Sequence, residues 1–320
     1  MLIFSIFKTP LLSLFFLYSI SAYSELSADN FSIRLASHNL NRFFDDRDDG
    51  DNEKILTTKH YQKRLNQLVE KVDKTYLFAD VIAFQEVENI NILKDASHLI
   101  AQRFKKHYRA ILIEGNDKSG MDVGFLVKQS IPVKSTDALF KDRYINPQKN
   151  LFSRPPLVIE ICPNSCLTII NLHLRSMRGL RSNKSSDYVA GKRVAQAEAI
   201  AQWVERYQRE HPNKKLIILG DLNALTPSDE YVDVIGTIIG NPDQKTPLYK
   251  SKDLISRDLI DITLNIESSK RYSYLYKKKK QQLDYALVSQ GLKKHIKSIG
   301  FSWIDYKFSD HAALIIDLGD

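Results

Sequence analysis

The stretch 216–224 constrains the fold of this chain more than any other part of the sequence. Residues 216–219 are apolar without interruption, and Gly220 closes the run. Such a run is typical of a strand that is buried on both faces, as in α/β proteins. Asp221 and Asn223 follow two positions apart, so both side chains leave the same side of an extended backbone. A carboxylate and an amide placed there can bind a metal-held phosphate, although an ordinary turn uses the same residue types.

Polar side chains also stand at the ends of other predicted strands. Apolar or alternating segments at 31–40, 79–84, 167–174, 283–288 and 312–316 predict strands, and helical spacing at 61–76, 89–104 and 189–207 predicts helices. An α/β protein usually places its chemistry at the carboxyl ends of strands. Each polar residue alone is also consistent with a turn, a solvated loop or a satisfied core histidine. The set comprises Asn39, Glu86, His173, Asp221, Asn223, Asp284, Asp310 and His311.

Basic residues crowd the segment that follows His173. The chain carries 46 Lys and Arg against 38 Asp and Glu, a formal net charge of +8. A moderate excess of this kind favours polyanionic partners, although basic loops are often only solvated. Arg154 precedes a predicted hairpin strand, and a lysine run, 277–280, forms a second basic turn. The residues after His173 are Arg175, Arg178, Arg181, Lys184, Lys192 and Arg193.

The two cysteines, Cys162 and Cys166, bracket the turn of a predicted hairpin at 157–170. A zinc site would need a second pair of Cys or His ligands, and the spacing offers none. A disulfide that closes the turn is the favoured interpretation, and a reduced pair of small core residues is the alternative.

The N-terminal segment 1–24 has the features of a signal peptide. A single Lys8 precedes an apolar run at 11–20, and small residues follow at the positions that a signal peptidase recognises. The run is short for a bilayer span, and a polar segment follows at once, which disfavours a membrane anchor. The sequence therefore predicts an exported protein, periplasmic or secreted, with no stable membrane span after cleavage. Residues 25–320 are expected to form a single domain, since no Pro- or Ser-rich linker divides them.

Six short motifs along the mature chain resemble the endonuclease/exonuclease/phosphatase superfamily, whose best-known member is deoxyribonuclease I. They occur in the family's order and cover nearly the whole mature chain: 39–41 (NLN), 85–87 (QEV), 171–173 (NLH), 220–223 (GDLN), 283–285 (LDY) and 309–311 (SDH). The resemblance implies a four-layered α/β/β/α sandwich of two mixed sheets, with the site at one edge. It also implies phosphoester hydrolysis that depends on Mg²⁺ or Mn²⁺.

The resemblance also implies roles for individual residues. Glu86 resembles the principal metal ligand, with Asn39 and Asp310 beside it. Asp221 resembles the residue that orients or deprotonates the attacking water, and Asn223 and His173 resemble the groups that hold the phosphate oxygens.

The remaining roles concern the partners of the histidines and the substrate contacts. His311 resembles a second catalytic histidine held by Asp284, and Asp122 stands where a carboxylate partner for His173 is expected. Arg154 stands where a contact to a substrate phosphate is expected. Deoxyribonuclease I has a DNA-contacting arginine where this chain has Glu88.

We therefore expect an exported, metal-dependent endonuclease that acts on DNA or RNA, with Arg154, Arg175 and Arg178 at the substrate. A phosphatase or phospholipase C-like hydrolase of lipid or small phosphoesters is the alternative enzyme. A binding protein that kept the fold and lost catalysis is disfavoured, because no position of the inferred set carries an inert residue. The sequence does not specify an oligomeric state.

Overall fold

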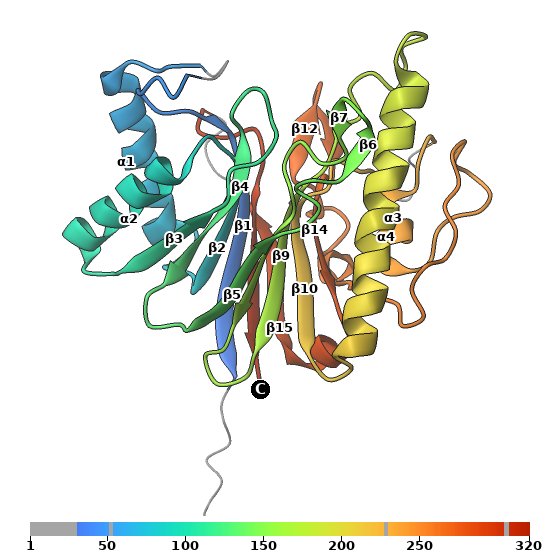
Figure 1. Ribbon diagram of the computed structural model, residues 1–320. Coiled ribbons are helices and arrows are strands. Elements are labelled where there is room, and N and C mark those ends of the chain that lie inside the picture. The colour runs from blue at the N-terminus through green and yellow to red at the C-terminus, as the bar shows by residue number, and fades with distance from the viewer. Residues whose placement is uncertain (1–30, 51–53, 227–229, 304–306) are drawn as a thin grey trace, which may run out of the picture.

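The computed structural model describes residues 31–50, 54–226, 230–303 and 307–320. Two six-stranded sheets lie face to face, and helices cover the outer face of each (Figure 1). The predicted four-layered α/β/β/α sandwich of two mixed sheets is confirmed. The predicted signal peptide lies outside the described residues.

Each sheet contains one parallel pair of strands in its interior, and its other pairings are antiparallel. In the first sheet β1 pairs with β2, and in the second β9 pairs with β10. The first sheet has the order β15 (Ile296–Ser302), β16 (Ala313–Gly319), β1 (Ser32–Phe43), β2 (Val81–Val87), β4 (Asp122–Lys128) and β3 (Tyr108–Leu112). The second has the order β11 (Ile260–Asp261), β14 (Asp284–Val288), β10 (Lys215–Asp221), β9 (Leu167–His173), β8 (Leu157–Ile161) and β5 (Val133–Ala138).

Three apolar layers hold the sandwich together. Helices α1 (Thr58–Lys74) and α2 (Ile90–Phe104) cover the first sheet, and α3 (Ser186–Glu210) and α4 (Val234–Ile239) cover the second (Figure 1). Ile217 of β10 packs in the layer between the sheets, whereas its neighbour Ile218 packs in the layer under α3. Alternate side chains of a strand point to opposite faces, so β10 is buried on both sides, as its apolar run predicts.

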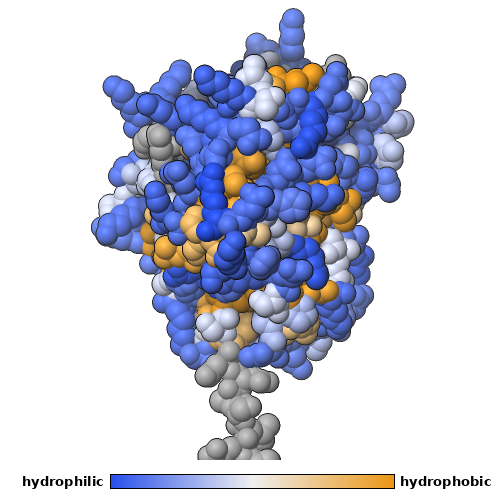
Figure 2. All heavy atoms as spheres, turned by 90° about the vertical axis from the view of Figure 1, so that its left-hand side faces the viewer, coloured by the Kyte–Doolittle hydropathy of each residue, from blue (hydrophilic) through white to orange (hydrophobic). Residues whose placement is uncertain are grey.

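The remaining elements are short. Two hairpins lie at the upper end of the sandwich in Figure 1: β6 (Tyr144–Asn146) with β7 (Lys149–Asn150), and β12 (Tyr274–Tyr276) with β13 (Lys279–Gln281). Two 3₁₀ helices are η1 (Ile262–Asn265) and η2 (Gln290–His295). Polar side chains predominate on the outer face that carries α1 and α2, with apolar ones visible only in separate patches (Figure 2). Within the described ranges, no helix is both long and apolar enough to span a bilayer.

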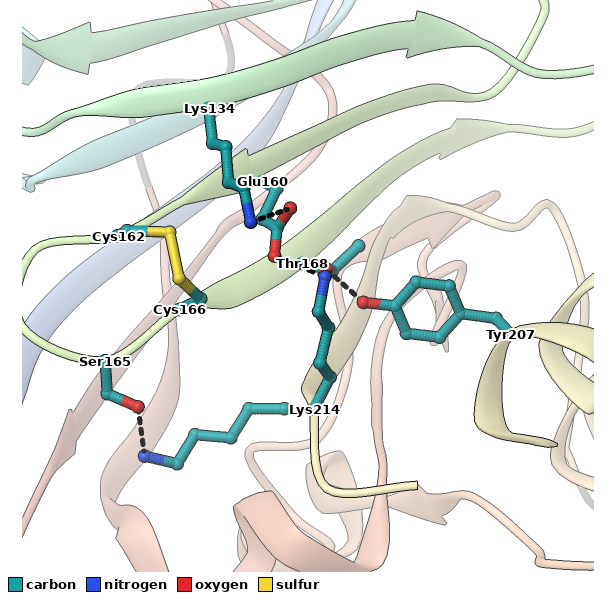
Figure 3. Close-up of a disulfide and its surroundings, with 9 residues drawn as sticks. Lys134, Glu160, Cys162, Ser165, Cys166, Thr168, Tyr207 and Lys214 are labelled. Atoms are coloured by element: carbon teal, nitrogen blue, oxygen red, sulfur yellow. Dashed lines mark hydrogen bonds and ion pairs between the residues drawn. A yellow bond between two sulfur atoms is a disulfide. The ribbon is translucent and has the colours of Figure 1, made fainter. Parts of the chain in front are cut away.

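A disulfide between Cys162 and Cys166 closes the β8–β9 hairpin, as the sequence predicts. Around it, Glu160 accepts a hydrogen bond from Lys214 Nζ at 2.6 Å, and Thr168 Oγ1 lies 2.6 Å from the hydroxyl of Tyr207 on α3 (Figure 3). The Tyr207 contact fastens the hairpin to α3, and the Lys214 contact fastens it to the connection between α3 and β10. The disulfide precedes β9, and His173 ends that strand, so the cross-link holds the end of β9 that lies away from His173.

Candidate active site

The polar residues predicted at strand ends meet at one edge of the sandwich. In the first sheet Asn39 of β1 pairs with Gln85, next to Glu86 on β2. In the second sheet Asp221 of β10 pairs with His173 on one side and Asp284 on the other. The register of the two sheets therefore brings these side chains to a common edge, as the strand-end pattern predicts.

Asn39 joins the two halves of the site. Its Nδ2 donates to Asp221 Oδ2 at 3.0 Å and to Glu86 Oε1 at 3.3 Å, and its Oδ1 accepts from the backbone N–H of Asn41 at 2.9 Å. The amide nitrogen and the amide oxygen of Asn39 are therefore both hydrogen-bonded within the site, and Oδ1 keeps one lone pair for a further contact.

Four residues at the same edge have a left-handed backbone conformation. Glu86 and Asn223 have φ values of 58° and 51°, and Asn41 and Arg42 have 51° and 54°. A left-handed residue with a side chain costs about 1–2 kcal/mol, so local contacts must hold it. Arg42 N donates to Glu86 Oε2 at 2.8 Å, and Asn223 N donates to Asp221 Oδ1 at 2.9 Å. The strained backbone thus fixes the direction of both carboxylates.

His173 lies between two carboxylates. Its Nε2 is 3.5 Å from Asp221 Oδ2 and 3.7 Å from Glu86 Oε1. Burial, reinforced by the positive charges of Arg154 and His311, lowers the pKa of His173 well below its usual range. The ring is therefore neutral near pH 7 and can donate or accept one hydrogen bond at Nε2.

The expected hydrogen bond between Asp122 and His173 is absent. His173 Nδ1 has no hydrogen-bond partner among the described residues, and Asp122 Oδ2 instead accepts from the backbone N–H of Gly115 at 3.0 Å. A Cβ at Gly115 would lie 2.2 Å from Asp122 Oδ1, so the glycine admits the carboxyl group against this loop. Burial there raises the pKa of Asp122 to about 8. The placement of Asp122 as the partner of His173 was therefore wrong.

His311 forms the predicted pair with Asp284. Its Nδ1 lies 2.7 Å from Asp284 Oδ2, and its Nε2 lies 3.9 Å from Asp221 Oδ2. Burial alone would lower the pKa of His311, but Asp284 and Asp221 together raise it to about 10. The ring is therefore positively charged near pH 7 and opposes the neutral His173 across Asp221.

Asp221 is the buried carboxylate at the centre of the site. Its side chain is 2% exposed. Burial raises the pKa of Asp221 to about 7, while His311 acts in the opposite direction. A carboxylate whose pKa lies near the working pH suits the transfer of a proton from a water molecule.

The oxygen donors of the site fit a hard divalent ion. Glu86 has a partly exposed carboxylate, and Asn39 Oδ1 keeps a free lone pair. Asp310 is also partly exposed, and it lies close enough to His311 to raise the pKa of that ring. Mg²⁺ is usually held by one or two carboxylates together with waters and substrate phosphate, so an incomplete protein cage suits it. Elsewhere in the described chain, Glu160, Cys162 and Cys166 bring three ligand atoms together, but the two sulfurs form the disulfide.

The basic residues separate into three groups. Arg154 pairs with Asp117 at 2.9 Å, and its buried Nε–H has no hydrogen-bond partner within the described chain. Arg154 is close enough to affect the pKa of both His173 and Arg175, and Arg178 also affects that of Arg175. Arg175 Nη2 also donates to the backbone oxygen of Arg178 at 3.1 Å, so these three arginines form a positive rim beside His173.

The other basic residues support the loops of the site or lie on the surface. Arg193 is buried, and its Nη1 donates to the backbone oxygens of Arg175 and Asn223 at 2.7 Å each, so it supports the site loops. Lys192 is buried and donates to Asn150 O at 3.0 Å. Arg181 is exposed and pairs with Glu230 at 3.1 Å.

Several residues that support the site receive no role in the sequence analysis. Gln85 Nε2 donates to Asn171 Oδ1 at 2.7 Å across the two sheets, directly beside Glu86. His38 lies 2.6 Å from the Tyr76 hydroxyl and 3.1 Å from the backbone oxygen of His311. The ring of Tyr274 lies 5.1 Å from that of His311. Gln85 and Asn171 belong to two of the six family motifs. A polar residue inside a buried strand is the signal that indicates such a cross-sheet contact.

Comparison with known proteins decides the family. A family model described as "Endonuclease/Exonuclease/phosphatase family" matches residues 34–315. The chain belongs to this family. Its enzymes are metal-dependent phosphoesterases and nucleases, and the chain is a phosphoesterase of this type. No curated protein sequence matched the chain.

Solved structures of family members share the fold. Truncated TDP2 from Caenorhabditis elegans is 17% identical, with a TM-score of 0.59, and the alignment covers 91% of this chain and 98% of that one. ANGEL2, described as a 2',3'-cyclic phosphatase, is 14% identical with a TM-score of 0.59 and coverage of 91% and 96%. A family protein from Bacteroides thetaiotaomicron is 14% identical with a TM-score of 0.57 and coverage of 91% and 98%.

Proposed function

We propose that the chain is an exported endonuclease that hydrolyses phosphodiester bonds in DNA or RNA with Mg²⁺ or Mn²⁺. The observation that carries the nucleic-acid assignment is the positive rim formed by Arg154, Arg175 and Arg178 beside His173. A polyanion gains more from such a rim than a small phosphoester, because several of its phosphates are held at once.

The side chains of the site suit in-line attack of water on a phosphodiester. Asp221 orients the water and accepts its proton, because its buried carboxylate has a pKa of about 7. His311, held charged by Asp284, and His173, through Nε2–H, stabilise the phosphate oxygens as they gain negative charge. Asn223 lies beside them, fixed through its backbone N–H and through Nδ2, which donates to Leu174 O at 3.2 Å.

Glu86, with Asn39 and Asp310, would hold the divalent ion. When bound, the ion supplies positive charge to a phosphate oxygen and lowers the pKa of a bound water. Arg154 would bind the substrate phosphate through its guanidinium, because the side chain is 16% exposed and close enough to His173 to lower the pKa of that ring.

Two features support export. The segment 1–24 has the composition of a signal peptide. The disulfide between Cys162 and Cys166 is stable in an oxidising compartment such as the periplasm or the exterior.

The test compares substrate classes with the purified mature protein. We expect cleavage of supercoiled plasmid DNA or of RNA with Mg²⁺ or Mn²⁺, no cleavage with EDTA, and slow release from a phospholipid or a phosphomonoester. Hydrolysis of lipid or monoester alone would overturn the nuclease assignment in favour of the phosphatase or phospholipase C-like alternative. Fractionation of a culture of the native host tests export. Retention of the protein in the cytoplasm would contradict it.

A further inference from the structure

The hairpin β12–β13 is attached directly to the catalytic edge. Ser273 Oγ accepts from the backbone N–H groups of Leu283 and Asp284 at 3.0 and 3.1 Å, and Ser273 O accepts from Ala312 N at 2.8 Å. Tyr274 also forms an antiparallel bridge with His311. The hairpin is thus anchored to the segments that carry the Asp284–His311 pair.

One face of this hairpin points into the site. The Tyr274 ring lies 5.1 Å from the His311 ring. Tyr276 stands two positions further along the strand, on the same face, and Lys279 opposes it across the hairpin. Burial and the nearby charges of Asp310, Asp221 and Glu86 raise the pKa of Tyr274, which agrees with this orientation. An aromatic row therefore begins at His311 and leads outward to a lysine.

The outer part of this row is exposed to solvent. Tyr276 is 49% exposed, although large aromatic side chains are usually buried. The turn beyond it consists of Lys277 and Lys278, both left-handed, with φ of 47° and 67°. Asn-Gly or Gly-Gly would adopt this two-residue turn with less strain. The sequence therefore retains two charges at the tip against the local preference of the backbone.

The spacing of the rings selects the form of nucleic acid. Residues two apart on a strand lie about 6.6 Å apart. A strand of B-form duplex advances only about 3.4 Å per nucleotide, and its bases are stacked on both faces. Neighbouring bases meet both rings only if the polynucleotide is stretched and its bases are unstacked, as in a single strand.

From this geometry we infer that the β12–β13 hairpin is a stacking platform, with Tyr274 and Tyr276, that makes the site prefer single-stranded over duplex nucleic acid. The inference rests on the proposed nuclease function and specifies the substrate class of the same site. Lys279, beside Tyr276, faces the phosphates of the bound strand.

Binding without turnover provides the direct test. Anisotropy of a fluorescein-labelled oligonucleotide is measured in EDTA, for the single strand and for the same strand in a duplex. We expect tighter binding of the single strand, and about fivefold or greater weakening of that binding in Tyr276→Ala. Tyr276→Phe, which keeps the ring, should bind as the wild type does, and Tyr276→Leu, which keeps only apolar bulk, should resemble the alanine variant.

Two results would overturn the platform: equal affinity of the wild type for single strand and duplex, or wild-type affinity in Tyr276→Ala. Hydrolysis of bis(p-nitrophenyl) phosphate with Mg²⁺ separates these failures from failure of the enzyme assignment. If the wild type hydrolyses this diester but does not bind the single strand preferentially, only the platform is wrong. If it binds the single strand as expected but hydrolyses neither diester nor nucleic acid, the proposed function is wrong and the platform stands.

Discussion

Asp221 is fixed by its neighbours at both carboxylate oxygens. Asn223 N donates to Oδ1, Asn39 Nδ2 donates to Oδ2, and the rings of His173 and His311 lie on the Oδ2 side. Because the Asp221 side chain is already fixed, it loses little conformational entropy when the substrate binds. Its contribution to the reaction therefore depends on its charge and not on a change of conformation.

Asp221→Asn should therefore lower kcat by about 10²–10⁴-fold, because the amide keeps the shape but cannot accept a proton at neutral pH. Thermal stability should fall only moderately, because the new NH2 group faces the N–H donor of Asn39 or Asn223 where a carboxylate oxygen accepted a hydrogen bond. Asp317→Asn, a partly exposed carboxylate paired with Arg34 away from the site, serves as the matched control with wild-type kcat. Near-full activity of Asp221→Asn would contradict the assignment of the proton acceptor.

Glu86→Gln tests the proposed metal ligand. The substitution removes one charge while the Arg42 N–H can still donate to the side-chain oxygen. We expect the Mg²⁺ concentration at half-maximal activity to rise by about tenfold or more, because even outer residues of metal sites change affinity by that factor. Titration of activity with Mg²⁺ measures it. An unchanged half-saturating concentration would show that Glu86 holds no metal.

The elements that were predicted correctly are those with two apolar faces or a long helical stripe. Predicted strands at 79–84 and 167–174 correspond to β2 and β9, and the predicted helix at 189–207 lies within α3. Strand β5 was missed because its central residues are exposed and polar, as is common for an edge strand, so its pattern lacks the apolar alternation.

The sequence predicts that the strand-end residues gather at one edge, but it does not predict the contacts that support them. Contacts such as Tyr274 with His311 join segments that share no local pattern. The sequence analysis places Arg193 among the basic residues that crowd the segment after His173, yet it follows Val189 and precedes Ala197 by four residues each, on the buried stripe of α3. That helical spacing was the available signal of its structural role.

Gly220 determines how closely β10 and β9 approach at the site. Its φ is 130°, and a Cβ there would lie 2.1 Å from the backbone oxygen of Leu172. Gly220→Ala should destabilise the protein by at least about 2 kcal/mol, because backbone strain adds to a contact that no side chain can relieve. Gly191→Ala on α3, where nothing lies within 4 Å, should instead be neutral or stabilise by up to about 1 kcal/mol. Urea unfolding of both variants measures this, and equal midpoints would refute the packing argument.

For the binding of a polyanion, the positions of the basic residues matter more than the net charge of the molecule. The net charge of +8 is moderate, and many basic residues are already committed to ion pairs or to backbone oxygens. The rim of Arg154, Arg175 and Arg178 is the part that borders the candidate active site. Long-range attraction of a polyanion should therefore depend on this rim.

A salt series with two matched arginine variants tests this dependence. A polyanion that binds the rim releases counterions, so the logarithm of its affinity should fall with the logarithm of salt concentration, with a slope of about −0.9 per duplex phosphate or about −0.7 per single-strand phosphate. Arg178→Ala should flatten this slope by about one phosphate's share. Arg181→Ala removes the same charge, but from an exposed side chain that is paired with Glu230, and should leave the slope nearly unchanged.

Nucleic-acid cleavage below saturation measures the slope, and bis(p-nitrophenyl) phosphate should show little salt dependence in any variant. Equal slopes for the two variants would mean that position does not matter, and the rim would then have no specific role in binding.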